Sequence, residues 1–207
     1  EIRTSDLKQK KYFYVPSFST RTIVYKGLMV PFQAERFYGD LADVRIVQKG
    51  DRYEPEIPEL RSNGFSEGRS IDFHSPYGCS KGAADQYVLD YVRTYEIPAV
   101  VFRMSCIYGV HQFGNEDQGW VAHFLIRAIA DSPITIYGDG RQVRDILFIE
   151  DLVDAFLLAQ SKMPELQGNA FNIGGGAGNT ISLLELLGLI EQIQGQEPEA
   201  SFSDWRA

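Results

Sequence analysis

The hydrophobic pattern from residue 75 onward changes repeatedly between a helical and a strand period, and this alternation restricts the possible folds more than any other feature. Apolar residues at helical spacing predict a long amphipathic helix over residues 77–96: Ala84, Tyr87, Val88, Tyr91, Val92 and Tyr95. Pro98 ends this helix. The continuous apolar run over 99–104 then predicts a strand that is buried on both faces.

The alternation continues to the end of the chain. Residues 120–130 and the segment that opens at Asp151 predict two further helices, whereas 134–137 and 170–173 predict short strands. The stretch 182–185 reads Ser-Leu-Leu-Glu, which is a capping box, and it starts a leucine-rich last helix. Strands and helices in this order predict an α/β fold.

Composition and charge exclude several classes of function. The 207 residues carry 28 acidic and 20 basic side chains, so the net charge of −8 argues against nucleic-acid or membrane-surface binding, which need a basic face. No run of eighteen apolar residues occurs, so we expect no membrane span. Cys79 and Cys106 do not form a Cys-x-x-Cys motif, and the three histidines lack ligand spacing. We therefore expect no metal site and a reducing, cytoplasmic setting.

The most specific chemical signal is the pentapeptide Tyr77-Gly78-Cys79-Ser80-Lys81 at the head of the predicted long helix. Residues four apart are neighbours on one helical face. An ammonium group beside a phenol stabilises the phenolate, so the pair can move a proton to or from an alcohol. Because Tyr-x-x-x-Lys also arises by chance, the spacing alone leaves a catalytic and an incidental interpretation open.

Three longer sequence motifs favour a catalytic role for Tyr77 and Lys81 over chance spacing. They read DFHSPYGCSKGAADQY over 72–87, FRMSCIYG over 102–109 and YGDGRQVRD over 137–145. With these blocks the chain from about residue 62 to its end resembles the extended short-chain dehydrogenase/reductase family of nucleotide-sugar epimerases and dehydratases. The resemblance implies the C-terminal part of a doubly wound Rossmann-type sheet and a small substrate-binding lobe.

The resemblance also implies roles for particular residues. Tyr77 would be the acid/base at the sugar hydroxyl, and Lys81 would hold the nicotinamide ribose of NAD. The cofactor would further contact Tyr77 and the stretch Met104, Ser105, Cys106 and Ile107. The nucleotide-sugar pocket would include Asn115, Gln118, Trp120, Gln142, Arg144 and Arg206. Both arginines would pair with the substrate diphosphate, although a solvated surface charge is the alternative for each.

The implied activity is epimerisation of a nucleotide sugar, with a CDP-hexose foremost. A sugar carbinol would be oxidised to a ketone by NAD and then reduced on its opposite face. Similar proteins dimerise through the helix at 77–96, so a homodimer through that helix is also implied. The tyrosines of that helix could instead serve internal packing.

Two features of the family are absent from residues 1–76. The glycines there have no Gly-x-x-Gly-x-x-Gly spacing, so the N-terminal glycine-rich βαβ unit is missing: Gly27, Gly39, Gly50, Gly64 and Gly68. Similar enzymes place Ser or Thr four residues before a Tyr-Gly pair, whereas Ala34 precedes Tyr38-Gly39 here. The glycine cluster at 174–178 also lacks the spacing and predicts a plain turn. These differences keep open a catalytically incomplete module that binds a nucleotide sugar or oligomerises.

The N-terminal segment has a different character. Residues 12–29 resemble part of the glutamine amidotransferase domain of glutamate synthase. That family uses an N-terminal cysteine as nucleophile, and no cysteine precedes Cys79, so we expect no glutamine hydrolysis. We therefore predict two parts: a segment 1–47 of different ancestry and a partial epimerase domain 48–207. The proline-rich, charged residues 51–70 predict a surface loop.

Overall fold

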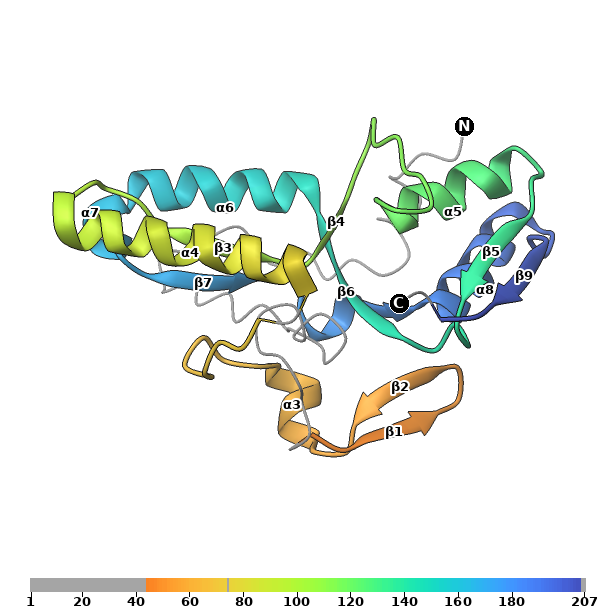
Figure 1. Ribbon diagram of the computed structural model, residues 1–207. Helices are drawn as coiled ribbons and strands as arrows, with labels where there is room; N and C mark the ends of the chain where they lie inside the picture. Colours follow the sequence, from red (N-terminus) through yellow and green to blue (C-terminus); the bar gives the residue numbers. More distant parts are fainter. Residues whose placement is uncertain (1–43, 74, 206–207) are drawn as a thin grey trace.

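The computed structural model describes residues 44–73 and 75–205. Figure 1 shows two lobes joined by the strands β4 (Cys106–Tyr108) and β6 (Val143–Phe148), with the hairpin of β1 and β2 beside them. The mixture of parallel strand pairs and helices confirms the predicted α/β class.

The first lobe has helices on both faces of a parallel strand pair. Strands β3 (Val101–Met104) and β7 (Ala170–Ile173) pair in register from Val101↔Ala170 to Met104↔Ile173. Side chains of consecutive strand residues point to opposite faces. Arg103 contacts Asp85 of α4 (Ser75–Tyr95), whereas the ring of Phe102 stacks on Phe156 of α6 (Ile149–Ser161). The two helices therefore cover opposite faces, as in the predicted doubly wound sheet.

Strand β3 is less buried than the sequence predicts. Its first two residues are half-buried, and Met104 is exposed. Among the residues that the structure describes, β7 is the one strand paired with β3, so one edge of β3 lies open. Helices thus cover both faces of β3, as predicted, but the strand is only partly buried, because no second strand pairs with it among the described residues.

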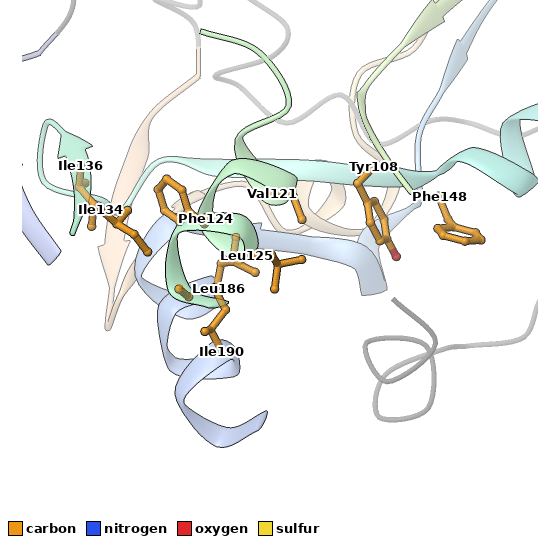
Figure 2. Packing of buried hydrophobic residues seen from close by; sticks show 10 residues of the cluster. Tyr108, Val121, Phe124, Leu125, Ile134, Ile136, Phe148, Leu186 and Ile190 are labelled. Carbon is orange, nitrogen blue, oxygen red and sulfur yellow. The ribbon is translucent and has the colours of Figure 1, made fainter. Parts of the chain in front are cut away.

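The second lobe is built around one apolar cluster (Figure 2). Helix α5 (Trp120–Ile129) contributes Val121, Phe124, Leu125 and Ala128, which share one helical face. Alternate residues of β5 (Ile134–Tyr137) and one face of α8 (Leu183–Gln194) extend the cluster with Ile134, Ile136, Leu186 and Ile190. Tyr108 of β4 and Phe148 of β6 complete it. Strand β9 (Ala200–Ser203) pairs in parallel with β5 at the rim of this lobe.

Strands β4 and β6 connect the lobes. They pair in parallel from Cys106↔Ile146 to Tyr108↔Phe148, and β6 pairs antiparallel with β8 (Thr180–Ser182). Ser105 lies between β3 and β4 and donates its N–H to the carbonyl of Ile173 in β7 at 2.8 Å. After Ser105 the chain leaves β7 and pairs with β6 instead. The sequence alone does not predict β4, β6 or β8 as strands.

Local sequence signals set the ends of the main helices. Helix α4 begins at Ser75, two residues before the predicted start, and ends at Tyr95, where Glu96 has a φ of 55°. The capping box of α8 is present in both directions between Ser182 and Glu185, as predicted. Short connecting elements complete the chain: α7 (Met163–Leu166) and the 3-10 turn η1 (Ala177–Asn179).

The prediction of a surface loop over 51–70 is wrong. Strands β1 (Ile46–Lys49) and β2 (Arg52–Pro55) form a hairpin, and α3 (Pro58–Asn63) follows. Gly50 has a φ of 61°, which suits the tight turn between the strands. The hairpin is fixed by distant partners, since Tyr53 donates its N–H to the carbonyl of Arg141 at 3.0 Å. Within the described residues, no helix is both long and apolar enough to span a membrane.

Candidate active site

A groove of about 400 Å³ runs between α4 and β3 in the first lobe. Tyr77, Lys81, Ala84 and Val88 line it from the helix, and residues 100–105 and Ile107 line it from the strand. The N-terminal end of α4 therefore lies beside the carboxyl end of β3. Clefts at the carboxyl ends of parallel strands are the usual ligand sites of α/β sheets.

Tyr77 and Lys81 lie together on the helical wall of this groove. Lys81 Nζ is 5.6 Å from the centroid of the Tyr77 ring, and 54% of Tyr77 is exposed. The first turn of the helix is held by a 2.8 Å hydrogen bond from Ser80 Oγ to the carbonyl of Tyr77. The two side chains that the sequence pairs as acid/base and cation are thus neighbours, and both are accessible to a ligand.

The predicted cofactor residues fall mostly in the same groove. Met104, Ser105 and Ile107 line it, whereas Cys106 is not among the lining residues. The hydroxyl of Ser105 is buried and has no hydrogen-bond partner among the described residues. A buried hydroxyl without a partner is costly, and a polar ligand group in the groove would satisfy it.

A buried ion pair joins the two walls of the groove below Tyr77 and Lys81. Arg103 Nε lies 2.6 Å from Asp85 Oδ2, and the two side chains are 4% and 3% exposed. Asp85 follows Lys81 by one helical turn, so the pair fixes the helix face that carries Tyr77 and Lys81 against β3. Sequence reasoning missed this pair; its signal is an arginine inside an apolar strand and an acid one turn after Lys81.

The predicted substrate residues that the structure describes lie outside this groove. Asn115 accepts hydrogen bonds at 2.9 Å from the N–H groups of Asp117 and Gln118, so it shapes the turn before α5. Trp120 begins α5 and packs edge-on against Phe124 at 5.7 Å between ring centroids. Asn115, Gln118 and Trp120 are therefore not among the residues that line the groove between α4 and β3.

Arg144 lies at the start of β6, and Gln142 immediately precedes this strand. The Gln142 side chain is buried and donates to the carbonyl of Tyr137 at 3.1 Å, so it stabilises the turn between β5 and β6. Arg144 is half-buried on β6, opposite Ile181 of β8. Arg206, Ala34 and the Tyr38-Gly39 pair lie outside the described residues.

The glycine cluster at 174–178 binds an internal carboxyl group. Gly175 donates its N–H to Asp145 Oδ1 at 2.7 Å, and Asp145 is fully buried. Burial raises the pKa of Asp145 well above its ordinary value, against the opposing effect of the N–H groups of Gly175 and Gly176. The loop that superficially resembles a phosphate-binding turn therefore directs two of its N–H groups at a side chain of the protein itself.

Comparison with known families assigns most of the described chain. Residues 53–174 match the family described as NAD dependent epimerase/dehydratase. Residues 1–49 match class-II glutamine amidotransferases. Both resemblances expected from the sequence are confirmed, whereas the division into domains at residue 47 stays a prediction.

Individual relatives agree with the first match. CDP-paratose 2-epimerase of Salmonella typhi is 46% identical over 161 residues, which are 75% of this chain and 47% of that enzyme. UDP-glucose 4-epimerase of Thermotoga maritima, solved with UDP-glucose, has 31% identity and a TM-score of 0.61 over 68% of this chain and 44% of its own. dTDP-glucose 4,6-dehydratase of Bacillus anthracis, solved with NAD, has 28% identity and a TM-score of 0.61, covering 69% and 44%. The chain thus spans less than half the length of these relatives.

Proposed function

Because this chain belongs to the NAD dependent epimerase/dehydratase family, we propose that it carries the proton-transfer part of an epimerase acting on a nucleotide sugar. The observation that supports this most is the placement of Tyr77 beside Lys81 on one wall of the groove. The similarity to CDP-paratose 2-epimerase makes a CDP-linked hexose the first substrate to test.

The proposed chemistry uses Tyr77 as the acid/base. Its phenolic oxygen takes the proton of a sugar hydroxyl when the carbinol is oxidised and returns a proton when the ketone is reduced. The Lys81 ammonium lies 5.6 Å from the centre of the phenol ring, on the same wall of the groove. The buried pair of Arg103 and Asp85 keeps the helix that carries both groups fixed against β3.

The residues of the groove fit the nicotinamide end of NAD. Lys81 and the buried hydroxyl of Ser105 offer polar contacts to a ribose and a carboxamide, and Met104 offers an apolar one. When bound there, NAD would supply hydride transfer to and from the sugar carbon. The sequence provides no glycine-rich turn for the pyrophosphate before Tyr77, so the fit covers one end of the cofactor.

The substrate side of the proposal rests on the second lobe. Arg144 would pair with the diphosphate of the nucleotide sugar, and Asn115, Gln118, Trp120 and Gln142 would shape the pocket. The proposal also includes Arg206, a homodimer through α4 and a cytoplasmic setting. The two cysteines, which are free thiols, suit a reducing compartment.

A second candidate function follows from the sequence before Tyr77, where residues 1–76 contain no glycine-rich turn for the pyrophosphate of a dinucleotide. A module that binds a nucleotide sugar without turning it over is therefore the alternative.

Titration of the purified chain with NAD and with CDP-glucose separates the two candidates. Absorbance and fluorescence report bound dinucleotide, and calorimetry reports the sugar nucleotide. The epimerase proposal expects both to bind. If the chain holds CDP-glucose but takes up no NAD at millimolar supply, the binding module is supported and epimerisation by this chain alone is rejected.

Replacing Tyr77 with Phe tests the acid/base role. The change removes the proton-transfer oxygen and keeps the ring beside Lys81, so we expect epimerisation to fall about 10²–10⁴-fold with ligand binding unchanged. Tyr87→Phe is the matched control, because Tyr87 is exposed on the same helix and does not line the groove. Unchanged turnover in Tyr77→Phe would show that another group moves the proton.

A further inference from the structure

We propose that residues 44–73 form a brace between the two lobes, which positions the turn at 138–141 in the second lobe relative to α4, the helix of Tyr77 and Lys81. The brace holds the hairpin of β1 and β2, α3 and the chain up to residue 73 (Figure 1). It has no part in the proposed chemistry. Its positioning role rests on the proposed function, whereas the coupling between the lobes rests on contacts within the fold.

One end of the brace is bonded to the second lobe. The Tyr53 hydroxyl donates to Asp139 Oδ2 at 2.5 Å, and the Tyr53 N–H donates to the carbonyl of Arg141 at 3.0 Å. The N–H of Arg141 donates in turn to Asp139 Oδ1 at 3.0 Å, which closes the turn. Gln142 and Arg144 follow directly. The hairpin therefore contacts the turn from which these two side chains extend.

The other end of the brace is bonded to β7 in the first lobe. Asn172 donates its backbone N–H to Glu67 Oε1 at 2.8 Å, and its side-chain amide donates to the carbonyl of Phe65 at 3.0 Å. Asn172 is 1% exposed and Phe65 is 4% exposed, so the second bond is shielded from water. Breaking such a bond is costly, because the buried groups lose their partners. This end of the brace is thus fixed to the sheet.

The brace also contacts α4 next to Lys81. The ring of Phe73 lies against Gly82, and a Cβ added to Gly82 would overlap that ring. The Cys79 thiol donates to the carbonyl of Phe73 at 3.6 Å. Glycine at position 82 therefore permits a close approach that a side chain would block. Since Gly82 directly follows Lys81, the brace touches the turn of α4 that carries the proposed proton-transfer pair.

A small apolar core inside the brace joins its two ends. Its members come from the start of the hairpin, from α3 and from the segment after α3: Val44, Ile46, Leu60, Phe65 and Ile71. Arg61 of α3 adds hydrogen bonds to the carbonyls of Pro55 and Glu56 at 2.7 and 2.8 Å. Packed side chains and hydrogen bonds of this kind carry displacements from one site to another. We therefore expect a change at one end of the brace to be felt at the other.

Coupling through the brace would serve the proposed reaction. A nucleotide sugar that pairs its diphosphate with Arg144 must present its sugar hydroxyl to Tyr77 in the other lobe. The covalent length of the substrate fixes this reach, so the two lobes have to keep one separation. A misplacement of about 1 Å can cost about 10²-fold in rate. Tyr53 and Phe73, at the two ends of the brace, are thus positioning residues.

Amide hydrogen exchange of the whole chain, followed residue by residue by NMR, tests the coupling from the first lobe. Gly82→Ala displaces the ring of Phe73, so exchange should quicken about threefold or more at the distant amides of Tyr53 and Arg141. Gly188→Ala is the matched control, because Gly188 also lies in a helix but has open space where its Cβ would be. It should not quicken exchange at either amide.

A milder variant tests the coupling from the second lobe. Tyr53→Phe removes the hydrogen bond to Asp139 and keeps the ring. Exchange should quicken about threefold or more at the amide of Asn172, which is bonded to Glu67 at the far end of the brace. The amide of Val101, which bonds to the chain just before β7, serves as the internal control. Coupling between two sites is reciprocal, so both variants have to show it.

A double variant separates displacement of the brace from damage to α4. Phe73→Leu keeps an apolar contact and leaves room for the Cβ that Gly82→Ala adds. The combination should return exchange at Tyr53 and Arg141 to within about twofold of the parent chain, since residues in contact are not additive. A change in the brace would not repair damage confined to the helix.

Calorimetry with CDP-glucose tests the positioning role. Tyr53→Phe should weaken binding about threefold or more, because the turn before Arg144 loses its bond to the brace. If the parent chain does not bind CDP-glucose, the proposed function and the positioning role are rejected together, and the exchange measurements still decide whether the lobes are coupled. Exchange changes confined to the mutated lobe, failure of Phe73→Leu to restore exchange, or unchanged CDP-glucose affinity in Tyr53→Phe would overturn the proposal.

Discussion

The contact between Arg103 and Asp85 shows how one buried residue pair can position a candidate catalytic face. The two side chains meet through two hydrogen bonds, at 2.6 and 3.2 Å, inside the wall that carries Tyr77 and Lys81. Asp85→Asn would leave the Arg103 guanidinium buried without its counter-ion, so we expect the free energy of unfolding to fall by roughly 3–5 kcal/mol. Urea denaturation measures this change.

A surface ion pair on the same helix provides the control. Arg93 and Asp90 are 3.9 Å apart and largely exposed, so Asp90→Asn should change stability by less than about 0.5 kcal/mol. Equal effects of the two substitutions would mean that the Arg103–Asp85 pair contributes no more than a solvated contact.

Asp145 gives a residue-scale prediction about pH. Burial raises the pKa of its carboxyl group, so the folded chain holds this proton more tightly than the unfolded chain does. Such a group favours folding below its unfolded pKa, and this contribution is lost as pH rises through the raised folded pKa. Asp145→Asn removes the ionisation, so its stability relative to the parent chain should increase with rising pH. Urea titrations at several pH values measure the difference.

Asp139 should behave in the opposite way and serves as the comparison. Burial alone would raise the pKa of Asp139, but a 2.5 Å hydrogen bond from the Tyr53 hydroxyl and one from the N–H of Arg141 hold it below its ordinary value. Its contribution is present above the unfolded pKa and lost as pH falls through the folded pKa. Asp139→Asn should therefore cost most stability at neutral pH. The same pH trend in both variants would contradict the assignment for Asp145.

At the scale of elements, the capping box of α8 has a role beyond its own helix. Ser182 Oγ accepts the N–H of Glu185 at 3.0 Å and donates to the carbonyl of Asp51 in the hairpin at 2.7 Å. Ser182→Ala removes both bonds, so we expect a loss of about 1–3 kcal/mol from the cap and the unsatisfied carbonyl together. Thermal unfolding measures the loss, and Ser201→Ala, at an exposed strand position, should have little effect.

Elements set by local signals were predictable from the sequence, and elements set by distant partners were not. Helix α4 and the cap of α8 follow from periodicity and from residues three apart, so their positions agree with the prediction. The hairpin of β1 and β2 depends on contacts far along the chain, such as Arg52 with Glu185 at 3.2 Å. The sequence of residues 51–70 alone does not reveal these distant contacts, so it does not predict the hairpin.

The same distinction applies to the candidate site. The Tyr77–Lys81 pair could be predicted because both residues lie within two turns of one helix. Three other features depend on how β3, β6 and the glycine cluster meet: the Arg103–Asp85 pair, the buried Asp145, and the Ser105 hydroxyl, which has no partner in the described part of the chain. Their roles follow from the assembled sheet.

At the scale of the whole molecule, α4 presents a row of tyrosines that the rest of the described chain leaves exposed. Tyr87, Tyr91 and Tyr95 are exposed at four-residue intervals, and the rings of Tyr91 and Tyr95 lie 5.1 Å apart. This row agrees better with the predicted homodimer than with internal packing, because aromatic rings exposed in one row are typical anchors of interfaces. We therefore expect sedimentation equilibrium to show a reversible dimer.

Tyr91→Glu should dissociate this dimer. The substitution places a charge at the centre of the row, where loss of an aromatic anchor costs about 2 kcal/mol or more, which weakens association about 30-fold. Phe113→Glu is the control, since Phe113 is 92% exposed and lies in the segment between β4 and α5. A dimer that resists Tyr91→Glu would show that copies of the chain associate through another surface.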